Sequence, residues 1–327
     1  MLASSTPPHR LPADDIVLAS RVRRAGAPSA FYRAVDSGDF RRVAPGAYVA
    51  AGRWATASAD ERFLLRVHAA AAVSRPGLLF SHHAAAALWR LPIVGGWPWK
   101  PDATVGATGV GERRAAFRAR KCVIPDDVGC IEGLSVTSLP RTLVDVGRTA
   151  PLSVSVTMMD HALSNSFAHQ VTRTALVTEL ARAHGVRGTA RCRTAIELAD
   201  GDSGSPGESV SRVAMYVLGA PEPTLQQRWF DDRGLIGITD FSWPELGAVG
   251  EFDGRGKYLR EEYTRGRDPG EVVVEEKWRE DRLRAIDLQV ARWDWHDAWS
   301  LPRLAQHLKR VGVPVGAKAR DLRNGAQ

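Results

Sequence analysis

Two short runs rich in β-branched and aromatic residues, joined by a turn, constrain the C-terminal third of this chain more than any other feature. The runs are residues 236–243 and 248–253, and Pro-Glu-Leu-Gly stands between them. Runs of this composition are typical of β-strands, while Pro and Gly suit a tight turn. The sequence therefore predicts a β-hairpin whose pairing sets Trp243 opposite Ala248 and Phe241 opposite Gly250.

The predicted hairpin carries three carboxylates. The same pairing sets Asp240 opposite Glu251, and Asp253 shares a strand face with Glu251 because side chains alternate with period two. Opposed like charges destabilise a strand pair, and a divalent cation such as Mg²⁺ or Mn²⁺, which carboxylate oxygens bind well, would remove the conflict. The sequence predicts a metal site here. The other interpretation is a solvated or salt-bridged sheet face, with Arg255 and Lys257 as partners.

The hairpin belongs to a longer series of elements. It follows residues 201–207, Gly-Asp-Ser-Gly-Ser-Pro-Gly, which are typical of a linker. Further elements are predicted as a helix over 208–218, a strand over 224–230, a helix over 272–286 and a strand over 288–293. The predicted order is α-β-β-β-α-β.

Five separated motifs in this region resemble one family of enzymes. They are Ser205-Pro206-Gly207-Glu208-Ser209, Gln226-Gln227, Thr239-Asp240-Phe241, Gly250-Glu251-Phe252-Asp253-Gly254 and Lys257-Tyr258. In this order they are similar to the very-short-patch-repair-like endonucleases of the PD-(D/E)XK nuclease superfamily. The resemblance implies metal-assisted hydrolysis of phosphodiester bonds. Asp240 and Glu251 would hold Mg²⁺, which lowers the pKa of a bound water and offsets charge on the scissile phosphate. Glu208 would complete the coordination directly or through water.

The lysine of the superfamily's E-x-K motif is replaced. Asp253 stands at its position. The role of the lysine then passes to Lys257, which we favour, to Lys277 in the following helix, or to no residue. As alternatives without function, Lys257 is a solvated loop charge and Lys277 pairs with a neighbouring glutamate.

The first fifty residues predict a second kind of module. Residues 14–24 have helical spacing, Gly26 ends that helix, Pro28 opens another over 29–37, and 40–50 alternate as a small hairpin. This is the layout of a winged helix-turn-helix, in which the second helix enters the major groove and the wing touches the DNA backbone.

The same region resembles a family of regulators. Residues 26–35, Gly-Ala-Pro-Ser-Ala-Phe-Tyr-Arg-Ala-Val, and 38–49, Gly-Asp-Phe-Arg-Arg-Val-Ala-Pro-Gly-Ala-Tyr-Val, are similar to the winged helix of AbiEi-type antitoxins, the regulatory half of type IV toxin-antitoxin systems. Residues 81–92 and 138–146 resemble the second domain of that family. Family members tend to have an arginine before the wing glycine, where this chain has Pro45.

The antitoxin resemblance implies contacts with DNA. Tyr32 and Arg33 would face the groove, and Arg41 and Arg42 would meet phosphates. The alternative is that Tyr32 is a packing residue and the arginines form a solvated face. The resemblance also implies a cognate nucleotidyltransferase-like toxin, related by operon rather than by contact.

Composition sets broader limits. The 327-residue chain has a net charge of +7, which favours phosphate-rich partners but also fits the arginine bias of a GC-rich genome. Three widely spaced cysteines, Cys122, Cys130 and Cys192, argue against a disulfide framework or a zinc site. The first twenty residues lack an apolar signal segment and no run is long enough to span a bilayer, so we expect a cytoplasmic protein.

Together these observations predict an α+β multi-domain protein. We expect a winged helix over 1–55, an antitoxin-like middle domain over 56–200 without a catalytic constellation, a nuclease-like domain over 201–312 and a tail over 313–327. Two functions remain open. The first is a metal-dependent DNA endonuclease delivered by the winged helix, and the alternative is an antitoxin-like transcriptional regulator whose nuclease fold is catalytically silent.

Overall fold

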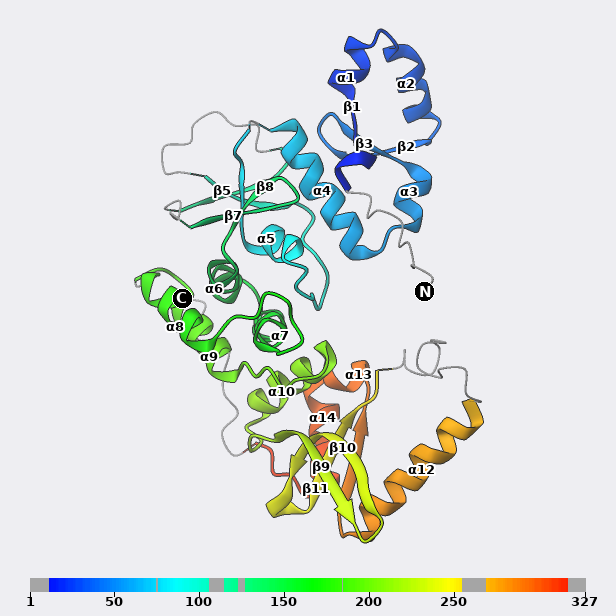
Figure 1. Ribbon diagram of the computed structural model, residues 1–327, viewed down its shortest axis with the longest axis vertical. Helices are drawn as coiled ribbons and strands as arrows, with labels where there is room; N and C mark the ends of the chain where they lie inside the picture. The colour runs from blue at the N-terminus through cyan, green and yellow to red at the C-terminus, as the bar shows by residue number, and fades with distance from the viewer. Residues whose placement is uncertain are drawn as a thin grey trace, which may run out of the picture. The chain divides into compact units, whose positions relative to one another are not determined.

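The computed structural model describes residues 12–74, 76–105, 115–122, 127–183, 185–254 and 269–316, and the chain divides into two compact units, Met1–Val146 and Gly147–Gln327 (Figure 1). The fold is mixed α and β, with three sheets in the described residues. Each unit is described by itself.

The first unit opens with a small three-stranded sheet and two helices. Its elements are a 3-10 turn η1 (Pro12–Asp15), β1 (Val17–Leu18), α1 (Ala19–Arg24), α2 (Pro28–Asp36), β2 (Phe40–Ala44) and β3 (Ala47–Ala50). The sheet order is β1-β3-β2. Gly26 and Gly38, both with positive φ, follow the two helices, as a left-handed residue favours glycine. Phe31 of α2 packs in a core with Ala19 and Tyr48. The predicted helix-turn-helix and hairpin are therefore present.

One local prediction in this region is wrong. The helix expected over 14–24 is interrupted, because Val17 and Leu18 pair with Tyr48 and Ala47 as an added strand. This short strand gives Val17 backbone partners on β3 and leaves only Ala19–Arg24 as helix. Helical spacing of the apolar residues did not reveal that long-range pairing.

The rest of the first unit is a five-stranded sheet with helices. The elements are α3 (Ala51–Thr56), α4 (Ala59–Val73), β4 (Leu79–Phe80), α5 (His82–Leu88), β5 (Asp102–Val105), β6 (Arg118–Lys121), β7 (Val128–Ile131), β8 (Leu134–Thr137) and α6 (Leu139–Thr149), which runs past the unit's end. The strand order is β6-β5-β4-β8-β7. Ser58 begins α4 with a capping box that includes Glu61. Arg141 and Asp145, four residues apart on α6, form an ion pair at 3.0 Å.

The second unit begins with helices that pack on one another. They are α7 (Leu152–Leu163), α8 (Arg173–Arg182), α9 (Thr189–Leu198) and α10 (Pro206–Leu218). Asp160 of α7 is buried and accepts hydrogen bonds from Ser209 at 2.7 Å and Arg212 at 3.0 Å, both on α10. These contacts cross residues 201–207 and lie within the second compact unit. The domain boundaries expected at 55/56 and 200/201 remain predictions.

A four-stranded sheet forms the end of the second unit. Its elements are β9 (Thr224–Asp231), β10 (Gly234–Trp243), η2 (Pro244–Leu246), β11 (Ala248–Phe252), α12 (Pro269–Ala285), β12 (Gln289–Trp293), α13 (Trp295–Ala298) and α14 (Leu301–Arg310). The order across the sheet is β12-β11-β10-β9, with β11 and β12 parallel and the other pairs antiparallel. The predicted α-β-β-β-α-β order is therefore confirmed.

Helices cover both faces of this sheet. On one face, Val249 packs with Leu283 of α12. On the other face, the next residue, Gly250, lies so close to Trp293 that an added Cβ would come within 2.3 Å of the indole ring. The indole nitrogen of Trp293 donates a hydrogen bond to Ser211 of α10 at 2.8 Å. Neighbouring residues of a strand point to opposite faces, so α10 and α12 lie on opposite sides of the sheet (Figure 1). Glu251, the residue after Gly250 on β11, points to the α12 side, where it pairs with Arg279.

Candidate functional site

The second helix of the winged fold presents a polar face. Phe31 and Val35 of α2 turn into the core, whereas Tyr32 and Arg33 are exposed. The Tyr32 hydroxyl accepts a hydrogen bond from Arg23 of α1 at 3.3 Å. This bond links the exposed faces of the two helices and orients the tyrosine ring.

The wing carries two exposed arginines with different surroundings. Arg41 and Arg42 follow one another on β2. The Arg41 guanidinium lies 5.2 Å from the centre of the Trp54 ring, which holds it by a cation-π contact. In the described parts of the chain, neither Arg41 nor Arg42 has a carboxylate within ion-pair distance. Both charges are therefore open to an anionic partner.

Within residues 12–50, six exposed arginines share this property. In the described residues none has a carboxylate partner, and they are Arg21, Arg23, Arg24, Arg33, Arg41 and Arg42. They lie on α1, α2 and β2, the elements that correspond to the predicted helix-turn-helix and wing. Uncompensated positive charge on this surface suits the phosphate backbone.

In the second unit, two predicted site residues, Glu208 and Asp240, come together around Gln226 of the Gln226-Gln227 motif. Gln226 of β9 donates to Glu208 of α10 at 3.0 Å and to Asp240 of β10 at 3.5 Å. Glu208 lies in the first turn of α10, where its backbone N–H donates to the cap residue Ser205 at 3.2 Å and its carboxylate accepts the backbone N–H of Gly204 at 2.8 Å. Burial, and then the nearby Asp240 carboxylate, raises the pKa of Glu208 above its ordinary value.

The hairpin register is as predicted at two of three positions. Phe241 pairs with Gly250 and Trp243 with Ala248. The ladder ends there, because the Asp240 carboxylate accepts the backbone N–H of Phe252 at 2.8 Å. A side chain thus takes the place of the next backbone contact.

Glu251 is bound by arginines. Its carboxylate forms ion pairs with Arg279 of α12 at 2.7 Å and with Arg292 of β12 at 3.1 Å. Arg292 also pairs with Glu276 and Glu280. Although burial lowers the pKa of Arg292, the neighbouring carboxylates raise it above its ordinary value, so the guanidinium stays charged. Two fixed cations at Glu251 neutralise the charge that a metal ion would otherwise offset.

The expected convergence of three carboxylates on one ion is absent from the residues that the structure describes. The four predicted ligands do not bring ligand atoms of any three within 4.8 Å of one another. Glu208 and Asp240 are close, but Glu251 is engaged on the α12 side and Asp253 donates its backbone N–H to Trp293 at 2.8 Å. The physical reason is that two arginines from outside the hairpin pair with Glu251, and Arg279 donates a hydrogen bond to its Oε2 at 2.8 Å. A metal site at this edge remains a prediction.

The lysine positions give no further support to catalysis. Lys257 lies outside the described residues. Lys277 is exposed on α12. Asp253 occupies the position of the motif lysine and is half-buried.

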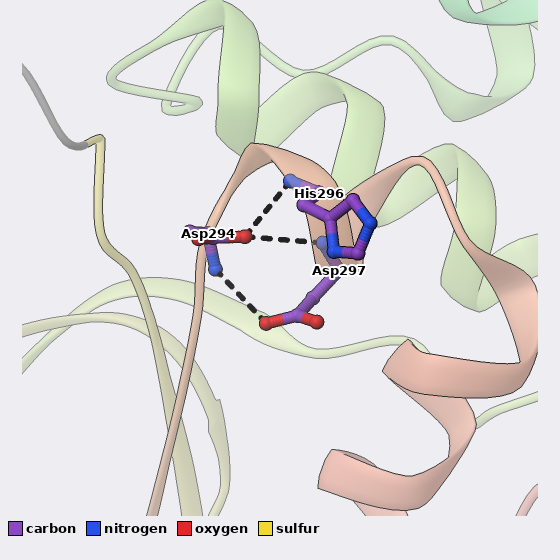
Figure 2. Close-up of side chains that lie close together, drawn as sticks. All are labelled: Asp294, His296 and Asp297. Carbon is purple, nitrogen blue, oxygen red and sulfur yellow. Dashed lines mark hydrogen bonds between the residues drawn. The ribbon is translucent and has the colours of Figure 1, made fainter.

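A different cluster has metal-ligand geometry but a structural explanation. Asp294, His296 and Asp297 lie within 4.8 Å of one another (Figure 2). Asp294 caps α13 by accepting the backbone N–H groups of His296 at 2.8 Å and Asp297 at 3.2 Å. Asp297 returns the contact and also pairs with His307 at 3.3 Å. The cluster is a capping box that begins a helix.

The comparison with known families bears on the middle of the chain. Residues 93–198 match the AbiEi antitoxin C-terminal domain. This match covers about a third of the sequence, from before β5 to the end of α9, and it contains the 138–146 stretch. The AbiEi resemblance is therefore supported here, whereas a nuclease-like domain is not. No curated protein matches the chain.

Some residues of this site could not be identified from the sequence. Arg279 and Arg292 are 28 and 41 positions from Glu251, and nothing local marks them as its partners. The one available signal is that a parallel strand after α12 sets Arg292 opposite Glu251 in register.

In the described ranges, no helix is long and apolar enough to cross a bilayer.

Proposed function

We propose that this chain is a DNA-binding transcriptional regulator of the AbiEi antitoxin kind, with a C-terminal sheet domain that does not cut DNA. The observation that carries the proposal is the winged helix with its exposed arginines lacking carboxylate partners. The AbiEi match over residues 93–198 supports it independently, because it lies outside the winged helix. The regulator thus accounts for the N-terminal region and for the matched residues 93–198, which extend into the second unit.

The surroundings of Glu251 support a silent C-terminal domain. A catalytic carboxylate that holds Mg²⁺ must offer its oxygens to the ion. Here both oxygens face guanidinium groups, of Arg279 and Arg292. Binding a cation would require breaking two partly buried ion pairs, and the α12–β12 network would be left unbalanced.

A second candidate function is a metal-dependent endonuclease. The observation that favours it is the approach of Glu208, Gln226 and Asp240 at the sheet edge. These residues fit a carboxylate-rich site for Mg²⁺ or Mn²⁺ with two of the predicted ligands. The residues would bind and orient the ion, and the ion would supply an activated water.

One experiment separates the two functions. Supercoiled plasmid is incubated with the full chain in Mg²⁺ or Mn²⁺, beside Glu251→Ala and Asp240→Asn, and binding to a 30-base-pair duplex is measured on the same samples. We expect duplex binding by all three proteins and no nicking. Metal-dependent nicking by the wild type that both variants lose would establish the nuclease and refute the silent domain.

The winged helix is tested with a matched pair of variants. Arg33→Ala removes an exposed arginine of α2, and Arg310→Ala removes an exposed arginine of α14. We expect Arg33→Ala to weaken duplex binding and Arg310→Ala to leave it unchanged. Equal affinities for all three proteins would contradict DNA contact through α2.

We further propose that a nucleotidyltransferase-like toxin is encoded beside this chain without binding it, so co-purification should recover no complex.

A further inference from the structure

Two tryptophans and three arginines form an alternating stack in the first unit. The Arg66 guanidinium of α4 lies 5.1 Å from the centre of the Trp54 ring and 4.0 Å from that of Trp99. Arg41 and Arg62 also lie over Trp54, at 5.2 Å and 5.6 Å. This Trp54–Arg66–Trp99 stack is therefore an aromatic platform with cations between and around its rings.

The positive charge in the stack is not compensated. The Arg66 Nε is buried and has no hydrogen-bond partner in the described residues. Arg62 donates to the carbonyls of Trp54 and Ala55, and in the same ranges no carboxylate pairs with Arg41, Arg62 or Arg66. Burial, and then the like charges of Arg41 and Arg62, lowers the pKa of Arg66. The cluster therefore places uncompensated positive charge directly beside the Trp99 ring.

Trp99 is exposed but fixed in place. Its side chain is 65% exposed, yet the chain around it reads Trp-Pro-Trp-Lys-Pro, in which two prolines restrict the backbone. Two residues earlier, Trp97 stacks on Phe63 with ring centres 4.7 Å apart, and its indole nitrogen donates to Asp60 at 2.6 Å. A large apolar ring held at the surface in this way is pre-organised for a partner.

A cavity of about 220 Å³ lies next to Trp99. Its lining includes Arg42, Pro45, Trp99 and Lys100. Pockets for drug-sized ligands measure roughly 300–1,000 Å³. This smaller cavity fits one flat ring, with two positive side chains, Arg42 and Lys100, placed for an attached anion.

We propose that Trp99, Arg42 and Lys100 form a binding site for a single nucleotide. The base stacks on Trp99, above the Arg66 guanidinium, and the phosphate lies against Arg42 and Lys100. The nucleotide is either a free nucleoside monophosphate or an unpaired nucleotide of a DNA strand, since both present the same base and phosphate. The site goes beyond duplex binding by the winged helix, because a base inside a duplex has no free face to offer.

The site is tested by calorimetric titration of the full chain. The probes are dAMP, inorganic phosphate, a single-stranded 12-mer and the matching blunt duplex. The variants are Trp99→Ala, Trp99→Phe and, as a control, Trp278→Ala, which removes a 66% exposed tryptophan from α12 in the other unit. Lys100→Ala is paired with Lys309→Ala, another exposed lysine.

We expect Trp99→Ala to weaken binding of dAMP or of the 12-mer by about five- to hundredfold, the range for one base–aromatic stack, with partial recovery in Trp99→Phe. Inorganic phosphate should respond to Lys100→Ala and not to Trp99→Ala. Saturable binding of dAMP identifies a free nucleotide as the ligand. Binding of the 12-mer without dAMP identifies an unpaired nucleotide in DNA.

Two results would overturn the site. One is that neither dAMP nor the 12-mer distinguishes Trp99→Ala from wild type, and the other is that Trp278→Ala weakens binding as much as Trp99→Ala. The duplex titration tests the regulator proposal independently of the nucleotide site. Duplex binding that persists without any effect of Trp99 refutes the nucleotide site alone, whereas absent duplex binding refutes the winged-helix contact alone.

Discussion

The wing makes a quantitative prediction about how salt weakens DNA binding. Arg41 and Arg42 are neighbours on β2, so their side chains leave opposite faces of the strand. Arg41 is held over Trp54 at 5.2 Å, whereas Arg42 is exposed beside the turn. We therefore expect Arg42 to be the principal phosphate contact of the wing.

The magnitude follows from counterion release. Each phosphate neutralised on a DNA duplex adds about 0.9 to the slope of log affinity against log salt. Arg42→Ala should lower that slope by about 0.9, so that between 50 and 200 mM salt the affinity of wild type falls about 3.5-fold further than that of the variant. The double variant of Arg41 and Arg42 should lower the slope by at most about 1.8.

The assay is fluorescence anisotropy with a labelled 30-base-pair duplex at four salt concentrations. A nonspecific sequence suffices, because the phosphate term does not depend on sequence. Arg310→Ala, which removes an exposed arginine from α14, serves as the control. If Arg42→Ala and the double variant keep the wild-type slope, the wing does not contact the backbone and this assignment is refuted.

Three further predictions concern stability, each measured by urea unfolding. Gly207→Ala would place a Cβ 2.0 Å from the ring of Phe252, and we expect a loss of about 1–3 kcal/mol from overpacking; an unchanged midpoint would contradict the close approach. Ser58→Ala removes the N-cap of α4 and should cost about 0.5–2 kcal/mol, whereas no cost would mean that the capping bonds are not formed. Burial and the Asp240 carboxylate raise the folded-state pKa of Glu208 above its ordinary value of 4.5. The Glu208 carboxyl therefore stabilises the fold at pH values below 4.5, and this stabilisation is lost as the pH rises through the folded-state pKa. Glu208→Gln should therefore gain stability relative to wild type as the pH rises from 4.5 to 7.5, and parallel pH profiles would count against this.

Local patterns predicted most of the C-terminal sheet. Apolar strands bounded by Pro and Gly fixed the hairpin, and the pairing of Phe241 with Gly250 followed from the turn length. Such features depend on residues close in sequence. The winged helix was predictable for the same reason, since Gly26 and Gly38 mark the ends of its helices.

The sequence did not predict which charges meet. The opposition of Asp240 and Glu251 suggested a missing cation, and the structure supplies two cations as Arg279 and Arg292. Their choice depends on how α12 and β12 return to the sheet, which no local pattern encodes. Two opposed carboxylates therefore predict that a positive charge lies next to them, but not whether that charge is a metal ion or an arginine.

Side-chain contacts between residues far apart in the sequence also join the segments before and after residues 201–207. Residues 201–207 have the composition of a linker, yet Asp160 on one side bonds Ser209 and Arg212 on the other. The composition of a segment indicates how much conformational freedom its backbone has. It does not report whether buried side chains hold the two sides together.

The buried contact between Asp160 and Arg212 has a consequence for how this protein can be rearranged by recombination. An exchange of the C-terminal sheet at residues 201–207 would set Arg212 against a foreign helix, while Asp160 would lose its only guanidinium partner in the described residues. An unpaired buried charge costs several kcal/mol, which is a large part of the stability of a domain. The helices α7 to α9 and the sheet are therefore coupled through α10, and we expect a recombination junction at residues 201–207 to give an unstable chimera.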